Sequence, residues 1–388
     1  MRPEHEHPLT DRASLPEKGG SGAAAPERRR LALSDYDFDL PDALVARAPL
    51  ERRDASRLLV LDRASGAFAH RSFRDWPGLL RPDDLVVLNE TRVIPARLLG
   101  RKEGSGGRVE LLLVRPDADV ETASALSGPA DAVGWVCLGQ ASKGLRPGTV
   151  VELDGGSATV AEALGEGEYR MRFETAGSLG RLLERAGLVP LPPYVAREPT
   201  PEDRTRYQTV YARVDGSVAA PTAGLHLTPE TFAELEARGV ERRFVTLDVG
   251  PGTFLPVRGE DESSHRMHAE RYHVPEETAA AVNRALSEGR RVVAVGTTVV
   301  RTLESAVDRG AVRAGAGSSR LFIRPPYRFQ VVDALLTNFH LPRSTLLMLV
   351  AAFAGLEHVL AAYRAAVAER YRFFSYGDAT FIAEGAVR

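Results

Sequence analysis

The segment that most constrains the fold runs from Arg291 to Ser305. Its four apolar residues 292–295, three of them β-branched, lead into Gly296-Thr297-Thr298 and then into residues with helical spacing. This order predicts a buried strand, a tight turn and a helix, as in an α/β sheet. Thr298 is the expected N-cap, and the free N–H groups of the first helical turn offer a site for a carboxylate or phosphate.

Three further stretches end an apolar run with small and polar residues in the same way: 220–226, 246–254 and 336–340. Ligands of open α/β sheets bind beyond the carboxyl ends of the strands, so we predict one rim and a small-molecule pocket. The alternative is an ordinary strand-to-helix turn at 296–298. Nucleoside triphosphate chemistry is not expected, because no Gly-rich loop with a lysine is present and Pro251 removes a donor from the nearest candidate.

Composition narrows the class of protein. With 44% hydrophobic residues, 26% charged residues and a formal net charge of -2, the chain is typical of globular proteins and not of proteins that coat polyanions. Its single cysteine, Cys137, excludes an intramolecular disulfide and indicates a reducing cytoplasm. No stretch approaches the roughly 20 apolar residues of a membrane span. The polar residues 1–32 are predicted to be a disordered tail.

Two regions with different patterns predict two domains. Residues 97–175 combine short strands with Gly-rich turns, which indicates an inserted antiparallel β-barrel. Residues 33–96 and 176–388 are expected to form the larger α/β domain. Barrel strands are predicted at 107–114, 133–138, 149–153, 157–162 and 168–173. In the α/β domain, strands are predicted at 57–62, 84–88 and 242–249, and helices at 42–48, 179–186, 229–239, 276–288, 345–354 and 356–370. Thr228 and Ser344 are the predicted N-caps.

The densest group of titratable residues lies at 265–273 and includes His265, His268 and Glu270. Histidine and glutamate are zinc ligands, but the alternating pattern favours a strand, which places His268 and Glu270 on one face and His265 on the other. Polar recognition or proton transfer by His268 and Glu270 is therefore preferred to a metal site. His226 and His340 belong either to the pocket or to the core.

Five motifs resemble one known family. Residues 89–98, 219–226, 295–298, 337–342 and 371–379 are similar, in order, to motifs of the S-adenosylmethionine:tRNA ribosyltransferase-isomerase family of queuosine synthesis. The resemblance covers roughly residues 33–383. It implies an α/β domain with an inserted barrel. It also implies transfer of the ribosyl unit of S-adenosylmethionine to a 7-aminomethyl-7-deazaguanine in the tRNA anticodon. The products are epoxyqueuosine, adenine and methionine, and we expect no metal, a cytoplasmic location and a monomer.

The resemblance and the chemistry together suggest roles for residues. Because the sulfonium acidifies the neighbouring ribose carbon, a general base is needed; the candidates are His226, His268, Glu270 and Asp248. S-adenosylmethionine is expected to contact Thr222, Gly224, Gly250, Thr253, Gly296, Thr297, Thr298, Arg301, Asn338 and His340. Arg301 and the 296–298 turn would hold the methionine carboxylate. For tRNA, the candidates are Arg92, Arg97 and Lys143 on phosphates and Phe373 and Tyr376 stacked on a base. An internal ion pair with Glu90 is the alternative for the two arginines.

The chain departs from the family pattern at three places. Asp248 replaces a typical histidine, Gln140 stands where arginine is usual, and Arg324 lies in a segment that replaces a Tyr-Pro-Gly pattern. These departures leave alternatives open. One is a paralogue that modifies a free nucleoside or another small acceptor; the second is a noncatalytic tRNA-binding protein, and the third is a metal hydrolase built on the histidine cluster.

Overall fold

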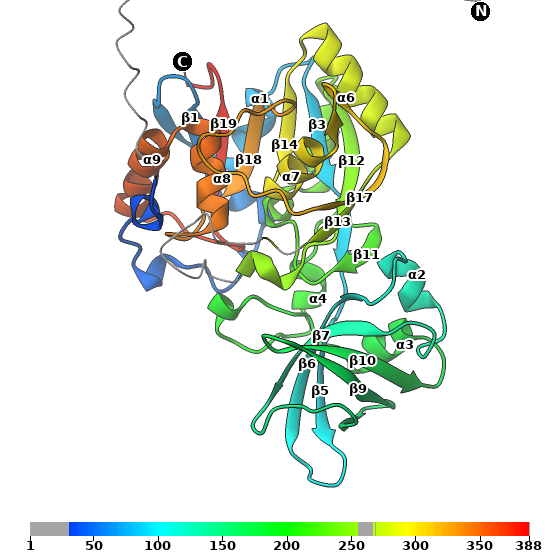
Figure 1. The fold of residues 1–388 in the computed structure, drawn as a ribbon. Coiled ribbons are helices and arrows are strands. Elements are labelled where there is room, and N and C mark those ends of the chain that lie inside the picture. The colour runs from blue at the N-terminus through cyan, green and yellow to red at the C-terminus, as the bar shows by residue number, and fades with distance from the viewer. Residues whose placement is uncertain (1–30, 255–266, 268, 388) are drawn as a thin grey trace, which may run out of the picture. The chain divides into compact units, whose positions relative to one another are not determined.

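The strand predicted at 292–295 lies in the middle of a nine-stranded mixed sheet (Figure 1). The computed structural model describes residues 31–254, 267 and 269–387. From edge to edge the sheet consists of β17 (Gly315–Ser319), β13 (Glu270–Val274), β12 (Glu241–Leu247), β3 (Leu85–Asn89), β14 (Val292–Val295), β18 (Ala334–Asn338), β19 (Ala379–Ala383), β1 (Arg57–Asp62) and β2 (Phe68–Ser72).

The central strands β12, β3, β14 and β18 are parallel to one another. Every residue of β3, β14 and β18 is buried, as expected for strands covered on both faces. Their carboxyl ends therefore meet at one edge of the sheet, and this edge is where the predicted rim belongs.

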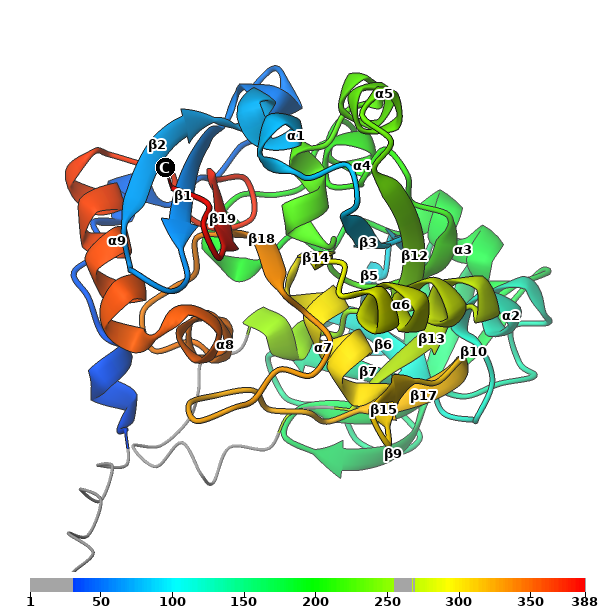
Figure 2. The same cartoon turned by 90° about the horizontal axis from the view of Figure 1, so that it is seen from above.

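Helices cover both faces of this sheet (Figure 2). On one face lie α6 (Glu276–Glu288), α7 (Thr297–Ser305) and α8 (Thr345–Ala354), and on the other lie α1 (Trp76–Leu79) and α5 (Pro229–Ala237). Thr228 and Ser344 accept hydrogen bonds from the backbone of the first turns of α5 and α8, which confirms both predicted N-caps. The N-cap of α7 is Gly296 and not Thr298, because the helix already begins at Thr297.

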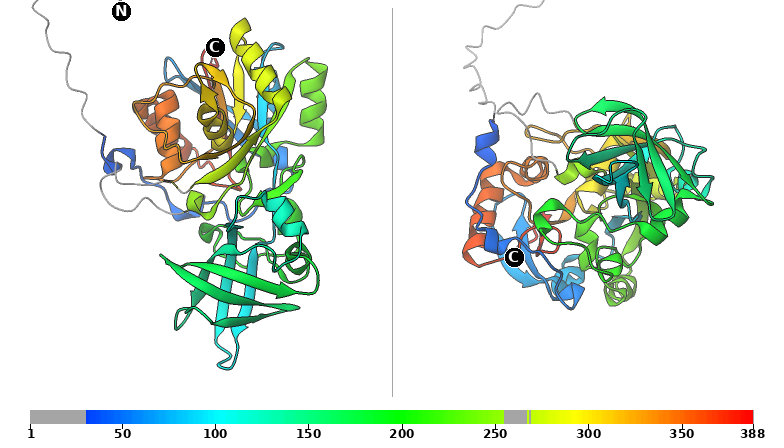
Figure 3. Two further views of the ribbon diagram at one scale, coloured as in Figure 1. Left: turned by 45° about the vertical axis from the view of Figure 1, so that its right-hand side comes forward. Right: turned by 90° about the horizontal axis from the view of Figure 1, so that it is seen from below.

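The predicted antiparallel barrel is confirmed (Figure 3). It closes in the order β10-β7-β6-β5-β8-β9, with β5 (Arg97–Lys102), β6 (Arg108–Pro116), β7 (Trp135–Ala141), β8 (Val150–Leu153), β9 (Gly156–Gly165) and β10 (Glu168–Thr175). Leu98, Leu111 and Phe173 are among the side chains that fill its core. The first barrel strand, β5, and the short helix α2 (Thr122–Ser127) were not predicted. The domain boundaries themselves stay a prediction.

Other segments refine or correct the predictions. Residues 42–48 form only a 3-10 turn at Asp42–Leu44. The aromatic stretch 371–378 is mostly buried and leads into β19, which lies in the interior of the sheet. Among the described residues, no single helix is long and apolar enough to cross a membrane; α8 and α9 (Leu356–Ala368) meet that test only as a pair bent by 116°. The remaining elements are α3 (Leu179–Ala186), α4 (Asp203–Arg206), β4 (Thr91–Val93), β11 (Val214–Ser217), β15 (Val307–Asp308) and β16 (Ala311–Val312).

Candidate active site

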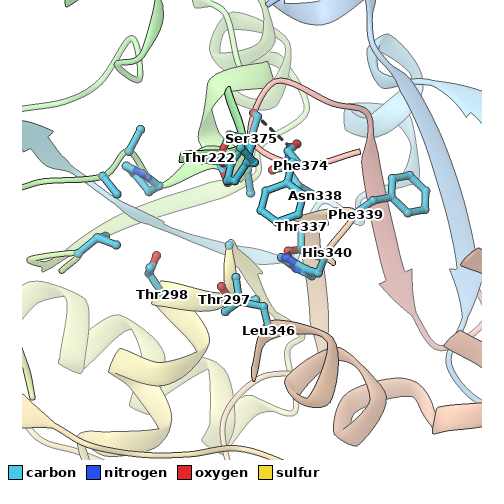
Figure 4. A pocket seen from close by; sticks show the side chains of 17 residues that line it. Thr222, Thr297, Thr298, Thr337, Asn338, Phe339, His340, Leu346, Phe374 and Ser375 are labelled. Carbon is cyan, nitrogen blue, oxygen red and sulfur yellow. Dashed lines mark hydrogen bonds between the residues drawn. The ribbon is translucent and has the colours of Figure 1, made fainter. Parts of the chain in front are cut away.

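A cavity, here called the rim cavity, lies beyond the carboxyl ends of β14 and β18 (Figure 4). It is lined by residues 219–223, Val249, 296–298 and 337–340, together with Tyr194, Leu346, Phe374 and Ser375. All four stretches predicted to share a rim therefore line one cavity. This result confirms that the four stretches share one rim. Binding of a small molecule there stays a prediction.

The turn between β14 and α7 forms one side of the rim cavity. Gly296 has a φ of 93°, a value that side-chain-bearing residues rarely adopt, and this conformation directs the chain from the strand into the helix. Asn89, at the end of β3, holds the turn: its Nδ2 donates to Thr298 Oγ1 at 3.3 Å and to the carbonyl of Leu247 at 3.1 Å. The first turn of α7 is thus fixed at the cavity wall, where its N–H groups favour an anion.

Asn338 contributes a buried amide to the opposite part of the cavity wall. Its Nδ2 donates to the carbonyl of Phe374 at 3.0 Å and lies 3.3 Å from His226 Nε2. Its Oδ1 is buried and has no hydrogen-bond partner among the described residues. The amide therefore presents an unused acceptor.

The two histidines of this region differ in position. His340 lines the rim cavity, its Nε2 lies 2.9 Å from Thr337 Oγ1, and burial lowers its pKa to about 3. His226 does not line this cavity; its ring stacks on Phe73 at 5.0 Å and its Nδ1 lies 2.7 Å from Ser56 Oγ. Burial is the main reason why the pKa of His226 is lowered to about 4. Both imidazoles are neutral near pH 7.

Arg301 does not line the rim cavity, contrary to the role expected for it. Its guanidinium forms an ion pair with the Glu270 carboxylate, and both side chains are buried. Glu270 also accepts from the N–H of Gly250 at 3.2 Å, and Arg301 donates to the carbonyl of Leu321 at 3.2 Å. The carboxylate that Arg301 binds is therefore that of Glu270, and the pair links β13 to α7.

Asp248 faces a second cleft, which is lined by α2 residues and by the ends of β12 and β13. Its Oδ2 accepts from Thr122 Oγ1 at 3.0 Å, and burial raises its pKa to about 6. Val249, the next residue, lines the rim cavity instead. Asp248 is thus outside the rim cavity, although it lies near enough to Glu270 for that carboxylate to contribute to its raised pKa. Gly224 is also absent from the lining of the rim cavity, and a Cβ there would lie 2.0 Å from the hydroxyl of Tyr211.

The candidate tRNA contacts fall into two groups. Among the cations, Arg92 forms two hydrogen bonds with Asp215 at 2.5 and 2.8 Å, and Arg97 pairs with Glu110 and Glu198, so neither pairs with Glu90. Lys143 is exposed after β7.

The two aromatic candidates are not at the surface. Phe373 is 0% exposed and packs on Phe339 with ring centroids 4.9 Å apart. Tyr376 is buried and donates through its hydroxyl to Asp203 at 3.1 Å. The prediction that these rings stack on a base is wrong, because an aromatic stretch alone does not distinguish a core from a surface.

The histidine cluster and Thr253 are the remaining predicted residues. His265 and His268 lie outside the described residues, and of Thr253 only the backbone is described, in the 3-10 turn Pro251–Phe254. Within the part of the chain that the structure describes, no group of three His, Cys, Asp or Glu side chains is arranged for a metal ion. The predicted absence of a metal stays a prediction.

Two aromatic side chains of the rim cavity were missed. The rings of Tyr194 and Phe374 have centroids 3.9 Å apart, and the Tyr194 hydroxyl bonds to Ser375 Oγ. Burial raises the pKa of the Tyr194 phenol, which therefore stays neutral. Neither ring was among the predicted contacts of S-adenosylmethionine, and the aromatic stretch around Phe374 was assigned to tRNA. These two rings give the cavity an aromatic wall.

The fold and the rim cavity together define a class: a mixed α/β protein with an inserted β-barrel and a cavity at the carboxyl ends of its strands. The family model described as queuosine biosynthesis protein matches residues 33–382. The chain belongs to this family of S-adenosylmethionine:tRNA ribosyltransferase-isomerases.

Individual relatives agree with the family assignment. An S-adenosylmethionine:tRNA ribosyltransferase-isomerase from Anaeromyxobacter sp. (strain Fw109-5) is 58% identical over 354 residues, which cover 91% of this chain and 99% of the relative. The protein of the same name from Syntrophotalea carbinolica is 55% identical over 91% of this chain and all of its own. The crystal structure of S-adenosylmethionine tRNA ribosyltransferase from Thermotoga maritima is 37% identical, with a TM-score of 0.51, over 90% of this chain and 100% of that one.

Proposed function

We propose that this protein transfers and isomerises the ribosyl unit of S-adenosylmethionine onto 7-aminomethyl-7-deazaguanine in the anticodon of tRNA. Epoxyqueuosine forms in the RNA, and adenine and methionine are released. The observation that carries this proposal is the 58% identity, over 91% of the chain, to a relative named for ribosyl transfer from S-adenosylmethionine to tRNA. The rim cavity supplies a place for the sulfonium substrate.

The walls of the rim cavity suit the two ends of S-adenosylmethionine. The aromatic wall of Tyr194 and Phe374 offers a flat apolar surface for adenine. Across the cavity, Thr297 and Thr298 begin a helix of nine residues whose N-terminus favours the methionine carboxylate. In this arrangement the ribose would lie between the two walls, near Thr337 and His340, whose side chains line the cavity (Figure 4).

The arrangement restricts the candidates for the general base. His226 uses both ring nitrogens within the protein, Glu270 is paired with Arg301, and Asp248 faces the second cleft. We therefore propose that these three residues stabilise the fold or position neighbouring groups, and that none of them is the general base. His268 keeps its proposed role in proton transfer. A tRNA partner, a monomeric state and a cytoplasmic location belong to the same proposal.

The proposal is tested by mass spectrometry of the products after the protein is mixed with S-adenosylmethionine and tRNA carrying the aminomethyl-deazaguanine. Epoxyqueuosine and an equal amount of free adenine are expected. Two parallel reactions serve as controls, one with the same tRNA bearing unmodified guanine and one with the free aminomethyl-deazaguanine nucleoside. Product from the free nucleoside alone would favour the paralogue, and tRNA binding without adenine release would favour a noncatalytic protein.

A further inference from the structure

The unused acceptor of Asn338 identifies a site of recognition within the rim cavity. The side chain is 2% exposed, and its Oδ1 has no partner among the described residues. A buried acceptor without a donor destabilises the folded protein, because the desolvation of its oxygen is not compensated by a hydrogen bond. A ligand that donates a hydrogen bond to this oxygen would remove that cost.

The surrounding hydrogen bonds fix the amide in this orientation. Nδ2 has two hydrogens, and three acceptors lie within reach: the carbonyls of Phe374 at 3.0 Å and Ser375 at 3.5 Å, and His226 Nε2 at 3.3 Å. If the amide were reversed, its oxygen would lie against the Phe374 carbonyl, so two acceptors would meet. The nitrogen therefore faces the protein.

This assignment also determines the tautomer of His226. Its Nε2 accepts from Asn338, so its proton is on Nδ1, which donates to Ser56 Oγ at 2.7 Å. The Ser56 hydroxyl points in turn to the carbonyl of Arg53 at 3.5 Å. Burial, which lowers the pKa of His226, keeps the imidazole in this neutral form. Ser56 and His226 thus position Asn338 without touching the cavity ligand.

The position of Asn338 indicates which donor it receives. Its Nδ2 is bound to the backbone of Phe374, whose ring forms the aromatic wall with Tyr194. Figure 4 places Asn338 beside Phe374 and Ser375, whereas Thr297 and Thr298 lie across the cavity. An acceptor beside an aromatic wall suits the edge of a stacked purine that carries an amino group.

We propose that Asn338 is a specificity-determining residue whose Oδ1 accepts a hydrogen bond from the 6-amino group of adenine in S-adenosylmethionine. The proposal rests on the proposed function, which places this substrate in the rim cavity. A 6-oxo purine would bring a carbonyl oxygen against Oδ1, and the site would reject it because neither acceptor has a donor.

The test is calorimetric binding, without tRNA, of S-adenosylmethionine and of its 6-oxo analogue S-inosylmethionine. The native protein should prefer the 6-amino form by roughly 10- to 100-fold. Asn338→Ala should lose most of this preference. Ser56→Ala, which removes the acceptor for His226 Nδ1, should reduce the preference while leaving the cavity wall intact. Asn283→Ala on α6 is the matched control, because this amide bonds to the backbone of Val312 in β16 and should not change the preference.

The outcomes are distinguishable. Equal affinity of the native protein for both ligands would overturn the role of Asn338, and this result does not depend on whether any variant folds. Equal loss of both affinities in Asn338→Ala, with the ratio unchanged, would make the residue structural and would also overturn the proposal. If the native protein binds neither ligand, the proposed function fails instead.

Discussion

Replacing Asp248 by asparagine is expected to stabilise the protein at neutral pH. Burial is the largest influence on this carboxyl and raises its pKa from 3.8 to about 6, although Thr122 and Arg271 favour the charged form. Since one pKa unit corresponds to about 1.4 kcal/mol, ionisation of Asp248 costs the folded state up to about 3 kcal/mol. The side chain is partly exposed, so we expect about 1–3 kcal/mol. Asparagine has the same shape and keeps an acceptor for Thr122.

The stabilisation expected for Asp248→Asn depends on pH. Because the pKa of Asp248 is raised on folding, the folded state binds the proton more tightly than the unfolded chain. The destabilisation of the folded state by ionised Asp248 is absent below pH 3.8 and complete above about pH 6. Urea unfolding should therefore show a gain for Asp248→Asn at about pH 7.5 and almost none at about pH 4. Asp131→Asn, at an exposed carboxylate, is the control. An equal gain at both pH values, or no gain at about pH 7.5, would refute the reasoning.

Glu270→Gln leaves the Arg301 guanidinium buried without its counter-charge, so the free energy of unfolding should fall by about 3–5 kcal/mol. Adding Arg301→Met should recover much of the loss, and no recovery in urea unfolding would contradict the pairing. Gly296→Ala should lower the free energy of unfolding by about 1–3 kcal/mol in the same assay, because alanine is strained at this positive φ. Phe373→Ala should lower the free energy of unfolding by about 3–5 kcal/mol. Normal stability together with weaker tRNA binding would instead support the original prediction that this ring stacks on a base. Lys143→Ala should reduce the slope of log affinity for tRNA against log salt by about 1, and an unchanged slope would remove Lys143 from the interface.

The parts of the fold that follow from local sequence were predictable. The helices 179–186 and 276–288 have the predicted bounds, because their apolar spacing and their first turns are set within a few residues. The strand β5 was missed for the opposite reason. Its residues pair with β6 and β8, and the Arg97 side chain binds Glu198, about a hundred residues away. Such pairings are decided by topology and not by local pattern.

The candidate site was likewise predictable only in the features that follow from local sequence. Small and polar residues after buried strands predicted the rim cavity, since parallel strands bring their carboxyl ends to one edge. The partner of Arg301 lies 31 positions away in β13, and nothing near Arg301 in the sequence indicates that Glu270 neutralises it. The unused Oδ1 of Asn338 is likewise visible only once Phe374 and His226 occupy its Nδ2. Sequence therefore located the rim, and the structure decided which side chains are free to contact a ligand there.

The departure at Asp248 bears on which acceptor the protein uses. In the chain after β12, Val249 lines the rim cavity and Asp248 faces the second cleft beside Thr122. Replacement of a histidine at this position therefore changes the second cleft and leaves the walls of the rim cavity as they are. A change of sulfonium chemistry does not follow from it. If the second cleft receives the acceptor, Asp248→His should alter the KM for tRNA and leave the affinity for S-adenosylmethionine unchanged. A change in the latter alone would place Asp248 in the chemistry of the donor.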